Sequence, residues 1–393
     1  MTQRRLFTSS SVVLGHPDKL CDRISDALVD TYLSVDPGAR VRAEVAAAGQ
    51  VLFLVTDVIS RAQVDITGVV RKTIAETHYF PQDLDPDRCA ILSQSSAMTP
   101  PWSGRHRKGE IEGENRAAQE QTTVFGYACS DTPERMPMPI QVAHLIARAA
   151  GALAVRGTIP GLGPDGTVLV TVEYADNRPV RIDTIVAEMQ YRGGSQELEE
   201  ALRSQVVVPI LGSMPIGMDN ATRLIVNPGG PLQAAGPARD AGHTGRKSAD
   251  DTYGGAARHG GHAMCGKDPS RLDRSASYAA RYIATNVIAA GLASECEVML
   301  SYSIGEARPT TVFARTFGTG ALLDERLSQV IARVFDLRPA AIEQRLRLRT
   351  LPAEHGGRFY RNLAEGGQFG RTDLDPPREK LDAVEALRSA AGA

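Results

Sequence analysis

One order of elements occurs three times along this chain of 393 residues, and any fold must accommodate all three copies. Apolar spacing predicts a helix from residue 17 to about residue 35, a hairpin with strands over 40–47 and 51–59, and a helix over 63–79. The hairpins recur roughly every 130 residues, which is typical of a duplicated supersecondary unit. The second copy is predicted as a helix over 139–156, strands over 167–174 and 180–189, and a helix over 196–207. The third is predicted as the helix that follows Asp273, strands over 296–303 and 310–316, and a helix over 324–335.

We therefore predict an α+β fold of three similar subdomains, each a β-sheet with helices on one face, in a pseudo-threefold arrangement. The opposite apolar faces of the sheets are expected to bury against one another in a composite core. The predicted divisions are 1–92 with parts of 221–270 for the first subdomain and the composite core, 93–121 for a flexible lid loop, 122–220 for the second subdomain, 271–374 for the third, and 375–393 for a C-terminal tail with a short exposed helix.

The segment 93–121 has no sustained apolar period and contains Pro100 and Pro101. A long irregular loop in a compact chain is commonly either a lid over a site or a disordered insertion. Trp102 and the basic residues 105–108 could cover an anionic ligand, and this composition favours the lid.

Charge and composition exclude several classes of function. The formal net charge of −2 and the isoelectric point near 6.5 argue against bulk binding of nucleic acid or an anionic membrane. We expect no membrane span, because mean hydropathy is −0.19 and no apolar run approaches the length that a span needs. The N-terminal residues do not resemble a signal peptide, and the five cysteines lack CxxC spacing, so we predict a cytoplasmic protein without a disulfide framework or a zinc site.

Glycine and basic residues are concentrated between Asp240 and Tyr282. Closely spaced glycines let backbone N–H groups approach an anion, and aspartates offer the hard oxygen ligands that Mg²⁺ accepts beside phosphate. The window also leads into a predicted helix, whose N-terminus favours anions. We predict a polyphosphate and metal site, and the alternative is a solvated loop whose charges maintain solubility. The basic members are Arg246, Lys247, Arg258, Lys267, Arg271 and Arg274, and the acidic members are Asp240, Asp250, Asp251, Asp268 and Asp273.

His16, Pro17 and Asp18 open the first predicted helix, where Pro17 suits the first helical position. Side chains at a helix start can point at a ligand, and a structural capping role for His16 and Asp18 is the alternative. Asp22 and Asp26 fall opposite the apolar stripe of this helix, where ordinary solvated carboxylates are an equally good interpretation.

Eight segments resemble, in order, those of methionine adenosyltransferases (S-adenosylmethionine synthetases). They are FTSSSVVLGHPDK, ISDA, FGYA, MPMPI, DAGHTGRK, DTYGGAARHGGHAMCGKDPSRLDRSASYAARY, FDLRP and GGQFGR, and together they extend over nearly the whole chain. The resemblance implies three similar subdomains, and a homodimer or homotetramer with active sites between subunits. It also implies transfer of the adenosyl group of ATP to the sulfur of L-methionine with release of pyrophosphate and phosphate, assisted by two Mg²⁺ ions and by K⁺.

The resemblance also implies roles for individual residues. A departing triphosphate must be stabilised by preorganised cations, whereas a thioether sulfur needs no general base. The implied catalytic residues are His16, Arg246 and Lys267; the ATP or triphosphate contacts are His16, Asp165, Asp240, Arg246, Lys247, Ala263 and Lys267; the methionine contacts are Asp57, Asp240 and Arg271; and the metal ligands are Asp18 and Asp273 for Mg²⁺ and Glu44 for K⁺.

Several positions depart from the family pattern. Thr167 stands where a lysine normally helps to hold the polyphosphate, and a charge-assisted hydrogen bond is worth about 1.5–3 kcal/mol. These departures leave open a diverged homologue that uses another thioether amino acid or only cleaves triphosphate, and a non-catalytic partner subunit of a true synthetase. The other departures are Ser10 and Leu14 for acidic residues, Asp57 for a loosely aligned glutamate, Met98 or a neighbour for a glutamine, Glu120 for an aspartate, Leu232 for an aromatic residue and Arg271 for a lysine.

Overall fold

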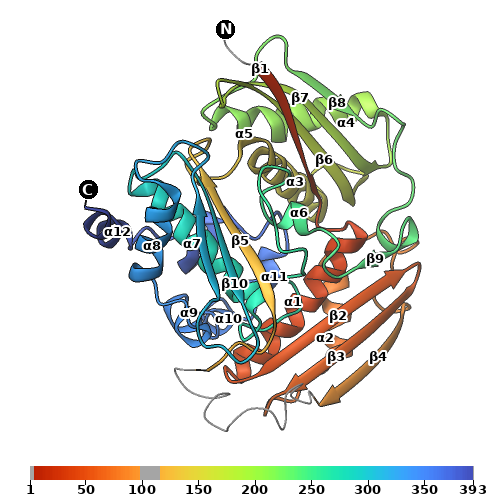
Figure 1. The fold of residues 1–393 in the computed structure, drawn as a ribbon. Helices are drawn as coiled ribbons and strands as arrows, with labels where there is room; N and C mark the ends of the chain where they lie inside the picture. The colour runs from red at the N-terminus through yellow and green to blue at the C-terminus, as the bar shows by residue number, and fades with distance from the viewer. Residues whose placement is uncertain (1–3, 98–115, 393) are drawn as a thin grey trace.

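A computed structural model describes residues 4–97 and 116–392 of the chain (Figure 1). The first copy of the predicted repeat is present, and its second strand has the bounds expected from the sequence. Residues 93–97, expected in an irregular loop, form part of a strand instead, and the predicted lid residues 98–115 lie outside the described residues. The elements are α1 (Pro17–Val35), β2 (Arg40–Ala48), β3 (Val51–Ile59), α2 (Ile66–Ala75) and β4 (Ala90–Ala97).

The second and third copies are also present, so the predicted threefold repeat is confirmed. The second copy consists of α3 (Met138–Arg156), β6 (Leu162–Ala175), β7 (Arg178–Tyr191), α4 (Ser195–Leu202), the π-helical turn η1 (Arg203–Val207) and α5 (Val208–Gly212). The third consists of α7 (Leu272–Ala289), β10 (Glu295–Tyr302), β11 (Thr311–Arg315) and α8 (Asp324–Val334). α3 is long and apolar enough to cross a membrane, but 72% of its apolar window is buried inside the molecule, as is usual for a core helix.

Further strands and short helices connect the repeats and follow the last one. They are β1 (Arg4–Val12), β5 (Thr122–Cys129), β8 (Arg223–Val226), η2 (Gly236–Ala238), β9 (Gly242–His243), α6 (Ser248–Asp251), α9 (Pro339–Arg345), α10 (Leu351–Glu354), α11 (Phe359–Leu363), η3 (Thr372–Leu374), η4 (Pro377–Glu379) and α12 (Val384–Ala391). α12 is the helix expected in the C-terminal tail, but its Leu387 is buried in the core of the third repeat, so this helix is docked through one face.

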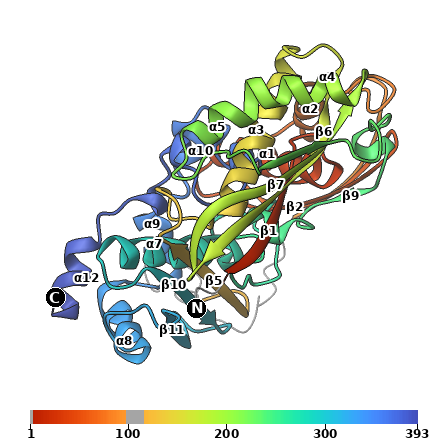
Figure 2. The same cartoon turned by 90° about the horizontal axis from the view of Figure 1, so that it is seen from above.

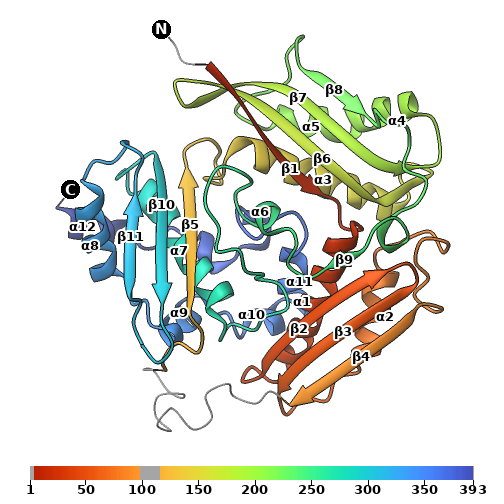
Figure 3. The same ribbon diagram turned by 45° about the vertical axis from the view of Figure 1, so that its right-hand side comes forward.

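The strands form three sheets, with the orders β4-β3-β2-β9, β1-β6-β7-β8 and β11-β10-β5. Sheet membership crosses the sequence order, because β1 pairs with β6 of the second repeat and β5 pairs with β10 of the third. The sheets face the viewer in Figure 3 with their helices behind them. Seen from above, α8 and α12 lie at the end of the molecule opposite β2 and β9 (Figure 2). The α+β class with helices on one face of each sheet is confirmed, while the subdomain boundaries stay a prediction.

The three sheets do not bury their outer faces against one another within the chain. The buried hydrophobic clusters instead lie on the helix side of the sheets, and one of them joins Val29 and Tyr32 of α1 and Ile140 of α3 with the third repeat. On the outer faces, Leu6 is 60% exposed, Phe53 is 50% exposed and Phe313 is 37% exposed. The expected burial of the outer sheet faces against one another is therefore wrong, and a single chain leaves these apolar faces uncovered; the core that the repeats share lies on the helix side.

Candidate active site

His16 is the N-terminal cap of α1, and its Nδ1 accepts the N–H of Asp18 at 3.2 Å. The neutral ring then carries its proton on Nε2, which becomes the nitrogen that can donate to a ligand. Burial, reinforced by the nearby charge of Lys247, lowers the pKa of His16 to about 4. The capping role is confirmed for His16 alone, and it leaves His16 a neutral donor near pH 7.

Asp18 is buried beside this cap and is surrounded by donors. Its Oδ1 accepts the N–H of His243 at 2.9 Å, and its Oδ2 lies 2.5 Å from Nζ of Lys247. Nη1 of Arg246 lies 3.6 Å from Oδ1. Burial raises the pKa of this carboxyl, but the hydrogen bonds from Lys247 and His243 outweigh burial and keep the pKa below its usual value. The start of α1 therefore holds a charged carboxylate with two cations beside it.

Two glycine-rich segments lie along one edge of β2: one includes Gly245 and carries Arg246 and Lys247, and the other includes Gly266 and carries Lys267. The N–H of Thr244 donates to the carbonyl of Val45 at 2.9 Å, and the N–H of Ala43 donates to the carbonyl of Gly266 at 2.8 Å. Gly266 has a φ of +75°, and a Cβ at this position would collide with the carbonyl oxygen of Ala43. These two parts of the window are packed into the fold rather than solvated, whereas Gly255, Arg258, His259, Gly261 and His262 between them are exposed, and the polyphosphate site stays a prediction.

A second cluster surrounds the start of α7. Nζ of Lys267 lies 2.6 Å from Oδ2 of Asp273, and Oδ1 of Asp273 accepts the hydroxyl of Thr122 at 2.7 Å. Glu120 accepts the backbone N–H of Asp273 at 3.2 Å and lies 3.3 Å from the guanidinium of Arg271. Burial, followed by the charge of Asp273, raises the pKa of Glu120. Lys267, Arg271 and Asp273 are thus brought together as the sequence implied.

One small cavity adjoins the second cluster. Ser248 and Asp251, which follow Lys247, line a cavity of about 20 Å³ together with Asp273. This volume accommodates a single water molecule and no larger ligand. The lining includes Asp273 of the second cluster but none of His16, Asp18, Arg246 and Lys247, so this cavity does not join the two clusters and is too small for a nucleotide.

Glu44 and Asp57 lie on the outer face of the first sheet, next to the second cluster. Oδ2 of Asp57 lies 3.3 Å from Nη2 of Arg42, and Oε1 of Glu44 lies 3.8 Å from Nε of the same arginine. The backbone of Arg42 also forms an isolated antiparallel bridge with Lys267. The two carboxylates therefore adjoin Lys267 through Arg42, although neither contacts its side chain in the described interactions.

The remaining predicted residues are placed differently from one another. Asp165 is buried, its Oδ2 accepts the N–H of Gly236 at 2.8 Å, and burial raises its pKa to about 6. Its neighbour in the turn, Pro164, accepts the N–H of Gly15 at 3.0 Å, which places this turn beside His16. Ala263 packs where a side chain of Gly245 would stand. Asp240 is exposed and its Oδ1 accepts the N–H of Ala241, so the structure shows it in no contact with the other predicted residues.

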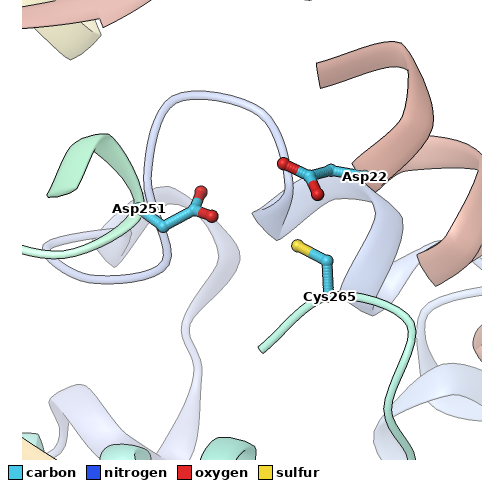
Figure 4. A group of neighbouring side chains, drawn as sticks. All are labelled: Asp22, Asp251 and Cys265. Atoms are coloured by element: carbon cyan, nitrogen blue, oxygen red, sulfur yellow. The ribbon is translucent and has the colours of Figure 1, made fainter. Parts of the chain in front are cut away.

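Asp22, Asp251 and Cys265 form a buried group whose potential ligand atoms all lie within 4.8 Å of one another (Figure 4). The ammonium of Lys19 already bridges the two carboxylates, 2.9 Å from Oδ2 of Asp22 and hydrogen-bonded to Oδ1 of Asp251. Burial also raises the pKa of the Cys265 thiol well above its usual value, which disfavours the thiolate that a metal requires. This group is an internal ion pair rather than a metal centre.

Sequence reasoning missed Lys19, named Asp251 only as an acidic member of the glycine-rich window, and left Asp22 and Asp26 undecided. The structure shows that both undecided carboxylates are fully buried, because α1 is covered on its polar side as well as on its apolar side. The available signal was the recurrence of aspartate every four residues along α1, which places all of these side chains on one stripe.

Fold and site together define an α+β protein of three duplicated sheets that carries cations on glycine-rich segments beside aspartates. Sequence models of the S-adenosylmethionine synthetase N-terminal, central and C-terminal domains match residues 4–100, 115–232 and 234–380. The chain belongs to the S-adenosylmethionine synthetase family.

Similar proteins extend over the whole chain. The S-adenosylmethionine synthase of Thermosynechococcus vestitus is 45% identical to this chain, and the alignment covers 99% of this chain and 98% of that protein. The S-adenosylmethionine synthase of Synechococcus elongatus is 42% identical, with 100% of this chain and 99% of that protein covered. The S-adenosylmethionine synthase of Gloeothece citriformis is 44% identical, and the alignment covers 99% of this chain and 98% of that protein.

Proposed function

We propose that this chain synthesises S-adenosylmethionine from ATP and L-methionine in the cytoplasm. The methionine sulfur attacks C5′ of the ribose, the C5′–O bond breaks, and its electron pair leaves on the triphosphate. Water then cleaves the triphosphate to pyrophosphate and phosphate. The observation that carries the proposal is the match to S-adenosylmethionine synthases along the entire chain, combined with two cationic segments packed on one strand edge.

In this reaction the charge that develops on the departing triphosphate is the main barrier that the protein can lower. Arg246 and Lys247 on one segment and Lys267 on the other would supply positive charge without reorganisation, since their backbones are fixed against β2. The Nε2–H of His16 would donate to the oxygen that leaves C5′. Asp57, Asp240 and Arg271 are proposed to bind methionine, and Asp165 and Ala263 to border the nucleotide.

Asp18 and Asp273 fit a role as Mg²⁺ ligands. Each is a hard oxygen donor held next to a lysine, and apart from the group that Lys19 already neutralises, the described part of the chain contains no cluster of three potential metal ligands. Mg²⁺ characteristically binds through one or two carboxylates and substrate phosphates while it keeps several waters. Bound with the nucleotide, two such ions would neutralise phosphate charge. Glu44 is proposed to hold K⁺ on the outer face of the first sheet.

We further propose that the chain acts as a homodimer or homotetramer with active sites between subunits. Each sheet exposes a large apolar side chain on its outer face, and the cavity beside Asp273 is too small for a nucleotide. Exposed apolar surface of this kind marks interaction sites when it is contiguous. Phe53 lies on the outer face of the first sheet, where Ala46 and Leu92 are its neighbours on the adjacent strands. A second copy packed on this face would also stand next to Glu44, Asp57 and Lys267.

We expect Phe53→Lys to produce monomers and to abolish most turnover, because a charge placed on the face opposes its burial. Light scattering coupled to size exclusion measures the mass, and the synthesis assay measures turnover. Leu323→Lys is the matched control, since Leu323 is 82% exposed at the start of α8, away from the sheet faces, and this variant should keep both mass and turnover. A fully active monomeric Phe53→Lys would show that the sites do not need a second subunit.

The proposed function is tested by incubating the purified chain with ATP, L-methionine, Mg²⁺ and K⁺ and identifying the products by mass. We expect S-adenosylmethionine, pyrophosphate and phosphate. Phosphate without an adenosylated product would instead indicate a diverged homologue. Assays with other thioether amino acids in place of methionine would then show whether one of them is adenosylated. No turnover, together with co-purification of a second synthetase chain, would indicate a non-catalytic subunit.

A further inference from the structure

Four aspartates recur at every fourth position of α1, namely Asp18, Asp22, Asp26 and Asp30, and all four are buried. Residues four apart lie on one stripe of a helix, and each step rises about 6 Å. The stripe therefore presents four carboxylates in a row over roughly 18 Å. Burial of four acidic side chains on one helix is costly unless each has firm partners.

Each carboxylate of the stripe accepts backbone N–H groups from a segment far away in the sequence. Asp18 accepts from His243 at 2.9 Å, Asp22 accepts from Gly245 at 2.8 Å, and Asp26 accepts from Gly266 at 2.8 Å. Asp30 accepts from Tyr360 and Arg361, both at 2.9 Å. The first three anchors hold the two segments that carry the proposed triphosphate cations, whereas the fourth holds α11.

The anchored glycines directly precede the cations. Gly245 is followed by Arg246 and Lys247, and Gly266 is followed by Lys267. Both glycines have positive φ, +82° and +75°, so each segment turns sharply at its anchor point. The direction in which each cation leaves the backbone is thus set next to a hydrogen bond from α1.

Two further cations secure the carboxylates themselves. The ammonium of Lys19 lies 2.9 Å from Asp22, and the fully buried guanidinium of Arg274 is paired with Asp26. Lys19 also binds Asp251 in α6, immediately beyond Lys247. These ion pairs fix the rotamers of Asp22 and Asp26, so their acceptor oxygens have a single position. Both aspartates are fully buried, so neither is open to a substrate in this structure.

We infer that Asp22 and Asp26 are positioning residues, which set the spacing of the triphosphate-binding cations through the backbone of Gly245 and Gly266. This inference rests on the proposed function for the identity of the anion, but it concerns geometry that the chain has before it binds any substrate. Asp30 has the same burial, helix and spacing, yet it anchors a segment that carries none of these cations, so it provides an internal control.

The test is the affinity of the full chain for inorganic triphosphate with MgCl₂, measured by calorimetry and compared with thermal unfolding. We expect Asp22→Ala to weaken binding roughly fivefold to tenfold, because Gly245 loses its anchor. Asp22→Asn keeps an acceptor oxygen and should remain within about twofold of the wild type. Asp30→Ala should lower the melting temperature at least as much as Asp22→Ala but leave triphosphate affinity unchanged. If Asp22→Ala does not fold, Asp22→Ser, whose shorter side chain withdraws the acceptor, takes its place.

Equal triphosphate affinities for Asp22→Ala and Asp30→Ala would overturn the inference, as would an Asn variant that binds as weakly as the Ala variant. A wild-type chain without triphosphate affinity would overturn it as well. A wild-type chain that binds triphosphate and shows this pattern, yet forms no S-adenosylmethionine, would leave the positioning role intact and remove only the proposed function.

Discussion

Lys267→Ala should reduce turnover in S-adenosylmethionine synthesis by about 10²–10³-fold, the usual cost of removing one preorganised group that stabilises developing charge. The ammonium is held 2.6 Å from Asp273 and its side chain is only 17% exposed, so it acts from a fixed position with little screening by water. The fold should survive, because the bridge between Lys267 and Arg42 involves backbone atoms and Asp273 keeps the hydroxyl of Thr122. Steady-state kinetics and circular dichroism check the two parts of this prediction.

Lys380→Ala is the matched control for this variant. Lys380 also pairs with an aspartate, Asp375, but it is 49% exposed and lies in the C-terminal segment. Its loss should leave turnover within about twofold, since exposed ion pairs contribute little. If Lys267→Ala lost no more turnover than Lys380→Ala, Lys267 would have no role in stabilising the leaving group.

Asp18→Asn should lower turnover by about 10²-fold and raise the Mg²⁺ concentration needed for half-maximal activity. The amide keeps the shape of the carboxylate and an oxygen that accepts the N–H of His243, so the start of α1 should stay intact. The substitution removes the negative charge that a metal ion would need. In the wild type, Nζ of Lys247 lies 2.5 Å from Oδ2 of Asp18. Turnover measured as a function of Mg²⁺ concentration separates weakened metal binding from a general loss of activity.

Asp65→Asn serves as the control for Asp18→Asn, because Asp65 is likewise an aspartate at a helix start. It caps α2 by accepting the N–H of Gly68 at 2.9 Å, away from both clusters. Its variant should keep the Mg²⁺ dependence of the wild type. An Asp18→Asn protein with normal turnover at low Mg²⁺ would exclude Asp18 as a metal ligand, and normal turnover in both Asp18→Asn and Lys267→Ala would remove the site assignment as a whole.

Much of the site could be predicted from local sequence. His16 was expected at a helix start because Pro17 and the apolar stripe mark that start, and the structure makes it the cap of α1. The dense glycines between Asp240 and Tyr282 predicted close backbone approach, and Gly266 meets the backbone of β2 at Ala43. Asp240 was grouped with the same residues by its position in the window, but position within a window does not determine which way a side chain faces.

The departures from the family pattern have uneven structural consequences. Glu120, which stands for an aspartate, still reaches the arginine at position 271, so the changed pair is self-consistent. Thr167 is paired with Val12 in the sheet between β1 and β6, and the structure shows no cation in contact with its side chain among the described residues. Met98 lies outside the described residues.

The sequence by itself determined the threefold repeat, the approximate bounds of its helices and strands, and the residue types available for an anion site, because all of these follow from periodicities within a few turns or a few strand residues. Only the tertiary structure decided that β1 joins the second sheet, that the sheets leave their outer faces open, and that Lys19 meets Asp251 across 232 positions of sequence. An aspartate stripe on a helix has the same pattern whether it faces water or a neighbouring segment. Its partners are backbone N–H groups, which every residue except proline carries, so nothing in the sequence could identify them before the chain was folded.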